Sequence, residues 1–235
     1  MNSDYKSITM CPPADLTAAK SAPARSSRIY TENVPQTPIS QSAFQHASAL
    51  LAPSILSHSM RVYLYAKALA EYSTSIYATD FAKHDLLFTA CLLHDIGTTE
   101  EYNGSQRFEV EGGDAAVKLL DQFDVSETDK RDVWTAIACH TSPQIAERIG
   151  ELSKLVRVAV ITDFGRKSSA WYMLEPLRER LEKELDRAEI EKVLGDAVVE
   201  QAKRRPEKAP MVSWPEAMYK AHLVEPKWSG VNKMF

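Results

Sequence analysis

Apolar residues recur at intervals of three and four along most of the chain, which is the spacing of amphipathic α-helices. No alternating stretch rich in Val and Ile is bounded by hairpin turns, so strands are not expected. The pattern therefore predicts an all-α protein. The expected helices lie near residues 42–51, 54–76, 84–95, 109–122, 128–140, 144–149, 152–165, 173–185, 189–204 and 214–222.

The first part of the chain lacks this pattern. Residues 1–41 are dominated by Ser, Thr, Pro and Ala and hold few large apolar side chains. Such a segment buries too little apolar surface to offset the entropy of ordering it. We therefore expect an extended or partly disordered arm over 1–41 and one helical domain over 42–235.

Composition adds mainly exclusions. The net charge of -4 provides no basic surface for nucleic acid. No run of about 18 apolar residues is present, so no membrane association is expected. The three cysteines, Cys11, Cys91 and Cys139, have no metal-ligand spacing, and an odd, unpatterned set favours a reducing compartment. We expect a cytoplasmic protein that acts on a small molecule.

Four ionisable side chains are expected on the buried faces of these helices, namely His58, His94, Asp95 and Asp163. An ionised carboxylate in apolar surroundings is strongly disfavoured unless it is paired, hydrogen-bonded or bound to a metal. Imidazole nitrogen and carboxylate oxygen together suit a divalent cation. The alternative for each residue alone is structural, with histidines bonded to backbone carbonyls and aspartates capping helices or paired with Arg61 or Arg157. The four residues together favour one metal site.

The order of these residues resembles the signature of the HD-domain metalloenzymes. His58 stands alone in the stretch LSHSMRVY, the pair His94-Asp95 lies in CLLHDIG, and Asp163 follows in ITD. The resemblance covers about residues 42–225. Its order and helical placement are specific, although a bare His-Asp dipeptide would mean little.

Within that superfamily the likeness is greatest to the cyanamide hydratases. Thr98 and Thr99 follow the His-Asp pair, the stretch FEVEGG begins at Phe108, and His140 in AIACHT matches an additional active-site histidine of that family. The resemblance implies a compact helical bundle that forms homodimers. It also implies a hydro-lyase that converts cyanamide to urea.

The same resemblance implies a role for each candidate residue. His58, His94, Asp95 and Asp163 would ligate one divalent metal, with Zn²⁺ expected first and Fe²⁺ or Mn²⁺ compatible with the same ligands. A metal-activated water would attack the nitrile carbon. His140, on an apolar helix face, would be a catalytic acid or hydrogen-bond donor, and Asp95 could take the proton of the water.

Three further residues are expected beside the substrate, namely Thr98, Thr99 and Phe108. The alternative for the two threonines is that their hydroxyls bond to the backbone of a turn. The main rival function is a phosphohydrolase of the same superfamily that acts on a nucleoside monophosphate or other small phosphate ester. Arg61, three residues after His58, could then meet the phosphate charge. A non-catalytic helical regulator that retains the site is the remaining class.

Overall fold

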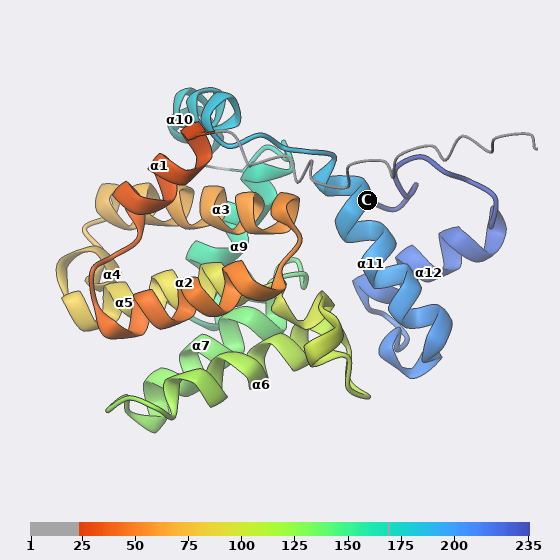
Figure 1. The fold of residues 1–235 in the computed structure, drawn as a ribbon, viewed down its shortest axis with the longest axis horizontal. Coiled ribbons are helices and arrows are strands. Elements are labelled where there is room, and N and C mark those ends of the chain that lie inside the picture. The colour runs from red at the N-terminus through yellow and green to blue at the C-terminus, as the bar shows by residue number, and fades with distance from the viewer. Residues whose placement is uncertain (1–23, 169) are drawn as a thin grey trace, which may run out of the picture.

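The computed structural model describes residues 24–168 and 170–235, and every regular element in that part of the chain is helical (Figure 1). The all-α class predicted from the hydrophobic pattern is therefore confirmed. The helices are α1 (Ala24–Asn33), α2 (Pro38–Leu50), α3 (Pro53–Tyr72), α4 (Ile76–Thr79), α5 (Phe81–Leu93), α6 (Phe108–Leu120), α7 (Glu127–Cys139), α8 (Ala146–Ile149), α9 (Glu151–Asp163), α10 (Trp171–Glu184), α11 (Ile190–Arg204) and α12 (Trp214–Val224). Three short 3-10 helices are η1 (Ile96–Thr98), η2 (Glu100–Tyr102) and η3 (Pro206–Lys208).

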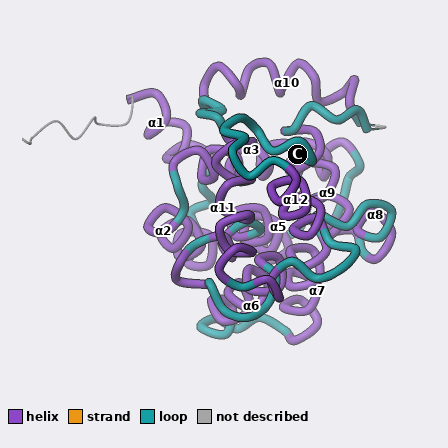
Figure 2. The backbone as a smooth tube through the Cα atoms, turned by 90° about the vertical axis from the view of Figure 1, so that its right-hand side faces the viewer, coloured by secondary structure: helices purple, strands orange, loops and turns teal. Residues whose placement is uncertain are grey.

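The centre of the bundle is made by α3, α5 and α9, each of which packs against the other two. Figures 1 and 2 place α10 on one side of this trio and α6 with α7 on the other. Helix α7 also packs directly on α5 and α9. Helix α5 is buried almost all round, as its nearly continuous apolar sequence requires. The four helices α3, α5, α7 and α9 therefore share one core.

The N-terminal prediction needs correction within the described residues. The segment 24–41, expected to be part of an extended arm, forms α1 and the start of α2. Ile29 and Tyr30 of α1 pack against the main core. Helix α2 begins at Pro38, where the side chain of Thr37 accepts a hydrogen bond from the backbone N–H of Ser40. Residues 1–23, with Cys11, lie outside the described part, and their predicted arm stays a prediction.

The helix expected over 54–76 ends four residues early, and a separate short helix begins at Ile76. Helix α3 ends at Tyr72, and Thr74 takes a left-handed backbone conformation with φ of 51°. Ser75 then caps α4 by accepting a hydrogen bond from the N–H of Tyr77. Consecutive hydroxyl residues favour such local bonds over helix continuation. The interruption turns the chain back so that α4 and α5 pack against α3.

The last two helices extend the bundle at one end. Helix α11 packs against α3, η1 and α12, and Figure 1 shows α11 and α12 beside the central helices. A second apolar cluster holds them to α6 through Phe108, Val198, Val199 and Met218. No helix within the described residues is both long and apolar enough to cross a lipid bilayer.

Candidate metal centre

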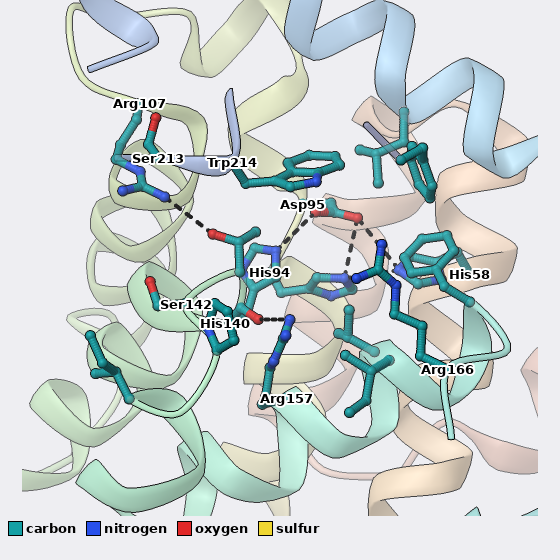
Figure 3. A pocket seen from close by; sticks show the side chains of 18 of the residues that line it. His58, His94, Asp95, Arg107, His140, Ser142, Arg157, Arg166, Ser213 and Trp214 are labelled. Carbon is teal, nitrogen blue, oxygen red and sulfur yellow. Dashed lines mark hydrogen bonds and ion pairs between the residues drawn. The ribbon is translucent and has the colours of Figure 1, made fainter. Parts of the chain in front are cut away.

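The candidate metal centre lies where three helices end. His94 caps the C-terminus of α5, His140 caps that of α7, and Asp163 is the last residue of α9. His58 comes from the second turn of α3. All four side chains are buried, and Figure 3 shows the three imidazoles gathered around the carboxylate of Asp95. Helix C-termini carry partial negative charge, so this convergence favours a cation.

Local helix geometry fixes the orientation of two of the rings. Nδ1 of His94 lies 2.7 Å from the carbonyl oxygen of Cys91, and Nδ1 of His140 lies 2.7 Å from that of Ile137. A carbonyl oxygen only accepts, so both Nδ1 atoms donate. Each bond also provides a partner for a carbonyl in the last turn of a helix. The Nε2 atom of each neutral ring is therefore unprotonated and points into the centre.

The ring of His58 also directs Nε2 into the centre, but its Nδ1 is held by a side chain and not by a backbone carbonyl. Its Nδ1 lies 2.7 Å from Oδ2 of Asp163, to which it donates a hydrogen bond. Its Nε2 then lies 3.1 Å from Nε2 of His94 and 3.6 Å from Oδ2 of Asp95. Nε2 of His94 lies 3.2 Å from the same Asp95 oxygen. Ligand atoms that share one ion at about 2.0–2.1 Å are separated by similar distances, roughly 3 to 3.5 Å.

The donor atoms fit a divalent cation. His58, His94 and Asp95 form a buried group that could hold a metal ion among the described residues. Two unprotonated Nε2 atoms facing each other repel unless a proton or a cation lies between them. Both carboxylate oxygens of Asp95 are buried, and neither has a hydrogen-bond partner in the described part of the chain. A cation shared by these three residues would satisfy the two Nε2 atoms and Oδ2 of Asp95.

The electrostatics of the group agree with this arrangement. Burial acts to raise the pKa of Asp95, but His94 and His140 outweigh it and hold that pKa well below its usual value. Burial acts to lower the pKa of His94, yet the adjacent Asp95 carboxylate raises it overall. Burial lowers the pKa of His58, which favours its neutral ring. The centre thus combines the ionised carboxylate of Asp95 with the imidazole of His94, whose protonated form that carboxylate favours.

Asp163 occupies a different place from the three residues above. Its two oxygens accept hydrogen bonds from Nε and Nη2 of Arg61 at 2.7 and 2.8 Å, in addition to the bond from His58. Burial would raise the pKa of its carboxyl, but Arg61 and His58 outweigh burial and lower it. The carboxylate of Asp163 contacts Nδ1 of His58, the ring nitrogen that faces away from His94 and Asp95. In this structure Asp163 therefore orients the His58 ring. Direct ligation by Asp163 stays a prediction.

Arg61 is fully buried, and its remaining nitrogen, Nη1, donates to the backbone carbonyls of Leu185 and Asp186. The guanidinium is therefore held on every side by the protein and does not line the pocket. Of the structural pairings weighed from sequence, the one between an aspartate and Arg61 is present at Asp163. It does not extend to Asp95. Arg61 is thus unable to provide the phosphate contact considered for the rival function.

A pocket of about 490 Å³ opens beside the centre. Its lining includes His58, His94, Asp95 and His140, so a molecule in the pocket would reach the candidate ligands and the additional histidine together. Nε2 of His140 lies 3.5 Å from Oδ1 of Asp95. The volume falls within the range of about 300–1,000 Å³ that is usual for small-molecule sites.

Three residues predicted to contact the substrate, Thr98, Thr99 and Phe108, do not line this pocket, and their substrate role stays a prediction. Thr98 and Thr99 donate hydrogen bonds to the backbone carbonyls of Asp95 and Ile96, and neither lines the pocket. Their hydroxyls serve the turn after α5, which was the alternative. Phe108 is 1% exposed and also lies outside the pocket lining. Its ring packs edge-on against the imidazole of His140 and so helps to hold that ring in place.

Gly97, two residues after Asp95 of the His-Asp pair, lies in η1 and does not have positive φ, whereas Gly165 does. A Cβ at Gly97 would lie 2.0 Å from the carbonyl oxygen of Phe108 and 2.8 Å from the N of Gly112. Gly97 therefore permits close approach of the segment after α5 to helix α6.

Several pocket residues were not identified from sequence. Arg107, Arg157, Arg166, Trp214 and Phe235 line the pocket and come from separate segments. Trp214 and Phe235 stack edge-on at 5.5 Å between ring centroids. No local spacing relates these positions, so only the folded arrangement shows them together. Arg157 was considered only as a partner for an aspartate.

An all-helical bundle in which buried imidazoles and a carboxylate converge at helix ends defines a helical metal-centre protein. Comparison with protein families identifies which one, since the model of the HD domain family matches residues 55–189. That span is more than half of the 235 residues, and the chain belongs to the HD-domain family. HD domains bind divalent metals and are generally metal-dependent hydrolases. A comparison with curated proteins gives no match.

The family match includes all four predicted ligands and His140, but not all of the pocket. It ends at residue 189, before α11 begins at Ile190. Leu194, Trp214 and Phe235 complete the pocket from beyond this limit. The centre therefore lies in the part shared with the family, while one wall of the pocket comes from outside it.

Proposed function

We propose that this protein hydrates cyanamide to urea at a single divalent metal held by His58, His94 and Asp95, with Asp163 orienting His58. Zn²⁺ is the expected metal, and Fe²⁺ or Mn²⁺ suits the same donors. When bound, such an ion supplies Lewis acidity and lowers the pKa of a coordinated water from its bulk value to about 7. The choice of cyanamide as substrate starts from the resemblance of the sequence to the cyanamide hydratases.

The observation that carries the proposal is the position of His140. It lines the pocket beside the candidate ligands, and its Nε2 faces Oδ1 of Asp95 at 3.5 Å. Its Nδ1 is committed to the carbonyl of Ile137, so the neutral ring offers an unprotonated Nε2. This ring is therefore first a proton acceptor. It becomes the donor expected from sequence only after it has taken up a proton.

The proton balance of nitrile hydration suits such a residue. The water oxygen forms a bond to the nitrile carbon while one carbon–nitrogen π bond breaks and the nitrogen takes a proton. A second proton then moves from oxygen to nitrogen, which gives urea. His140 can accept the proton of the water at Nε2 and return it to the nitrogen. Asp95 stabilises the protonated ring, because its carboxylate lies against that same Nε2.

A second candidate function is favoured by a separate observation. The guanidinium groups of Arg157 and Arg166 line the same pocket, and arginine is well suited to phosphate. A phosphohydrolase acting on a small phosphate ester would use the same centre to break a phosphorus–oxygen ester bond. Arg61, considered for this role from sequence, is excluded from it by its burial.

The test is a pair of product assays on purified protein, each with the metal restored and with a chelator. Urea release from cyanamide that needs metal supports the proposal. Phosphate release from a nucleoside monophosphate without urea release would support the second candidate instead. A protein that binds no metal and turns over neither compound after metal has been supplied would favour a regulator.

A further inference from the structure

Two arginines beside the candidate centre share a single ion pair, at 3.4 Å between Arg157 and Glu147, within the described residues. Arg157 lies in α9 and Arg166 lies three residues after that helix ends at Asp163. Both line the pocket. Figure 3 shows the two guanidinium groups directed toward the cluster of His58, Asp95 and His140. Arg157 is partly buried and Arg166 is exposed. Two positive charges therefore border the space that a substrate would occupy.

The hydrogen bonds of these arginines leave donors available. Arg157 donates from Nη1 to the carbonyl of His140 at 2.9 Å, and its Nε contacts Glu147 at 3.4 Å, which is a long bond. The side chain of Arg166 has no hydrogen bond or ion pair within the described residues. Burial lowers the pKa of Arg157, Glu147 opposes this, and the charge of Arg166 lowers it further. The two cations thus repel each other across the pocket.

The other charged groups of the pocket do not remove this excess. Arg107 is paired with the buried carboxylate of Glu109, so its charge is already balanced. Asp95 is the one carboxylate side chain that lines the pocket in the described part of the chain, and it belongs to the candidate metal group. Arg157 and Arg166 therefore remain without a strong carboxylate partner.

The size of the pocket agrees with a ligand larger than cyanamide. Cyanamide has three non-hydrogen atoms, whereas a pocket of about 490 Å³ accommodates a considerably larger molecule. The remaining space is bounded by aromatic rings, including Phe164, Trp214 and Phe235. A molecule with a reactive group at the centre and a charged group at the arginines would occupy more of it.

We propose that Arg157 and Arg166 form an oxyanion-binding subsite next to the metal centre, and that the pocket also accepts substrates larger than cyanamide that carry a carboxylate or phosphate group there. The part of this inference that concerns the substrate rests on the proposed function. The part that concerns anion binding rests only on the two arginines. Charge-assisted hydrogen bonds from guanidinium to an oxyanion are about twice as strong as neutral ones.

The first experiment measures binding of inorganic phosphate to the metal-free protein by calorimetry. Removing the metal excludes direct phosphate coordination. We expect millimolar or tighter binding by the unmodified chain, at least tenfold weaker binding by Arg166→Gln, and unchanged binding by Arg180→Gln. Arg180 is the matched control because it is exposed and lies outside the pocket. Equal phosphate affinity for the unmodified chain and Arg166→Gln, or no binding by either, would overturn the subsite.

A second experiment, on the metal-loaded protein, distinguishes a carboxylate substrate from a phosphate substrate. Cyanoacetate carries a nitrile and a carboxylate, and phenyl phosphate carries a phosphate ester. We expect Arg166→Gln to lower kcat/KM for whichever compound is turned over, at least tenfold more than Arg180→Gln does. An equal effect of both variants, or turnover of neither compound, would contradict the substrate part. Phosphate binding by the metal-free chain does not depend on catalysis. A protein that binds phosphate but releases no urea from cyanamide would therefore retain the anion subsite and lose only the proposed function.

Discussion

The carboxylate of Asp163 accepts a hydrogen bond of 2.7 Å from Nδ1 of His58, a residue 105 positions earlier in the chain. This bond directs Nε2 of His58 toward His94 and Asp95. The carboxylate is held in turn by the fully buried guanidinium of Arg61. A chain of contacts from Arg61 through Asp163 to His58 therefore joins the packing of α3 and α9 to the orientation of one candidate ligand.

Replacement of Arg61 with Ala should destabilise the protein strongly. It would leave the buried carboxylate of Asp163 without its main cationic partner, and breaking a buried pair by removing one member costs about 3–5 kcal/mol. Urea unfolding of the metal-free protein measures this change. Arg180→Ala is the surface control and should change the unfolding free energy by no more than about 0.5 kcal/mol. Similar effects of the two variants would show that the buried pair contributes little.

Replacement of Gly97 with Ala should also reduce stability, because a Cβ at this position would lie 2.0 Å from the carbonyl oxygen of Phe108. Backbone must move to relieve that contact, and overpacking of this kind costs about 1–3 kcal/mol. Gly150→Ala is the matched control. Gly150 is extended, with φ of 179°, and a Cβ there meets only Ser153 at 3.9 Å. Thermal unfolding should therefore separate the two variants, and equal melting temperatures would contradict the close approach.

Replacement of His140 with Gln should leave the metal in place and lower turnover. His140 lies outside the group of three candidate ligands, while positioned acid–base groups contribute about 10²–10⁴-fold to rate. Metal content by mass spectrometry and urea release are measured on the same preparation. Full metal occupancy with unchanged kcat would remove the proton-transfer role. His222→Gln controls for loss of a histidine, since His222 lies away from the centre.

Replacement of His94 with Ala should abolish metal binding without unfolding the chain. The variant removes one of three donors in a group whose Nε2 and carboxylate atoms lie within 4.8 Å of one another. A ligand that binds only the folded state also raises the melting temperature. Added Zn²⁺ should therefore stabilise the unmodified protein and His222→Ala, but not His94→Ala. Equal stabilisation of all three would place the metal elsewhere.

Sequence periodicity predicted most of the fold because the relevant information is local. The 3.6-residue repeat located α3, α5, α7 and α9, and it placed His58, His94, Asp163 and His140 on buried faces. It failed at α1, where the apolar residues are few and the helix depends on packing against the core. It also missed the interruption at Thr74, which depends on hydroxyl side chains rather than on hydrophobicity.

The parts of the site that sequence could not predict depend on contacts between distant segments. The role of Gly97 follows from its approach to α6, and the pairing of Asp163 with Arg61 follows from the crossing of α9 and α3. Arg166 follows α9, whereas Trp214 begins α12 and Phe235 comes after it, and these distant segments line one pocket only in the folded chain. The homodimer and the cytoplasmic location stay predictions.

The shared metal site is tested by a crystal structure of the zinc-loaded protein with anomalous data at the zinc edge. We expect one strong anomalous peak per chain, about 2.0–2.2 Å from Nε2 of His58, Nε2 of His94 and a carboxylate oxygen of Asp95. The same map would show whether Asp163 joins these ligands. No peak at this position, or a peak held by other residues, would contradict a metal centre formed by His58, His94 and Asp95.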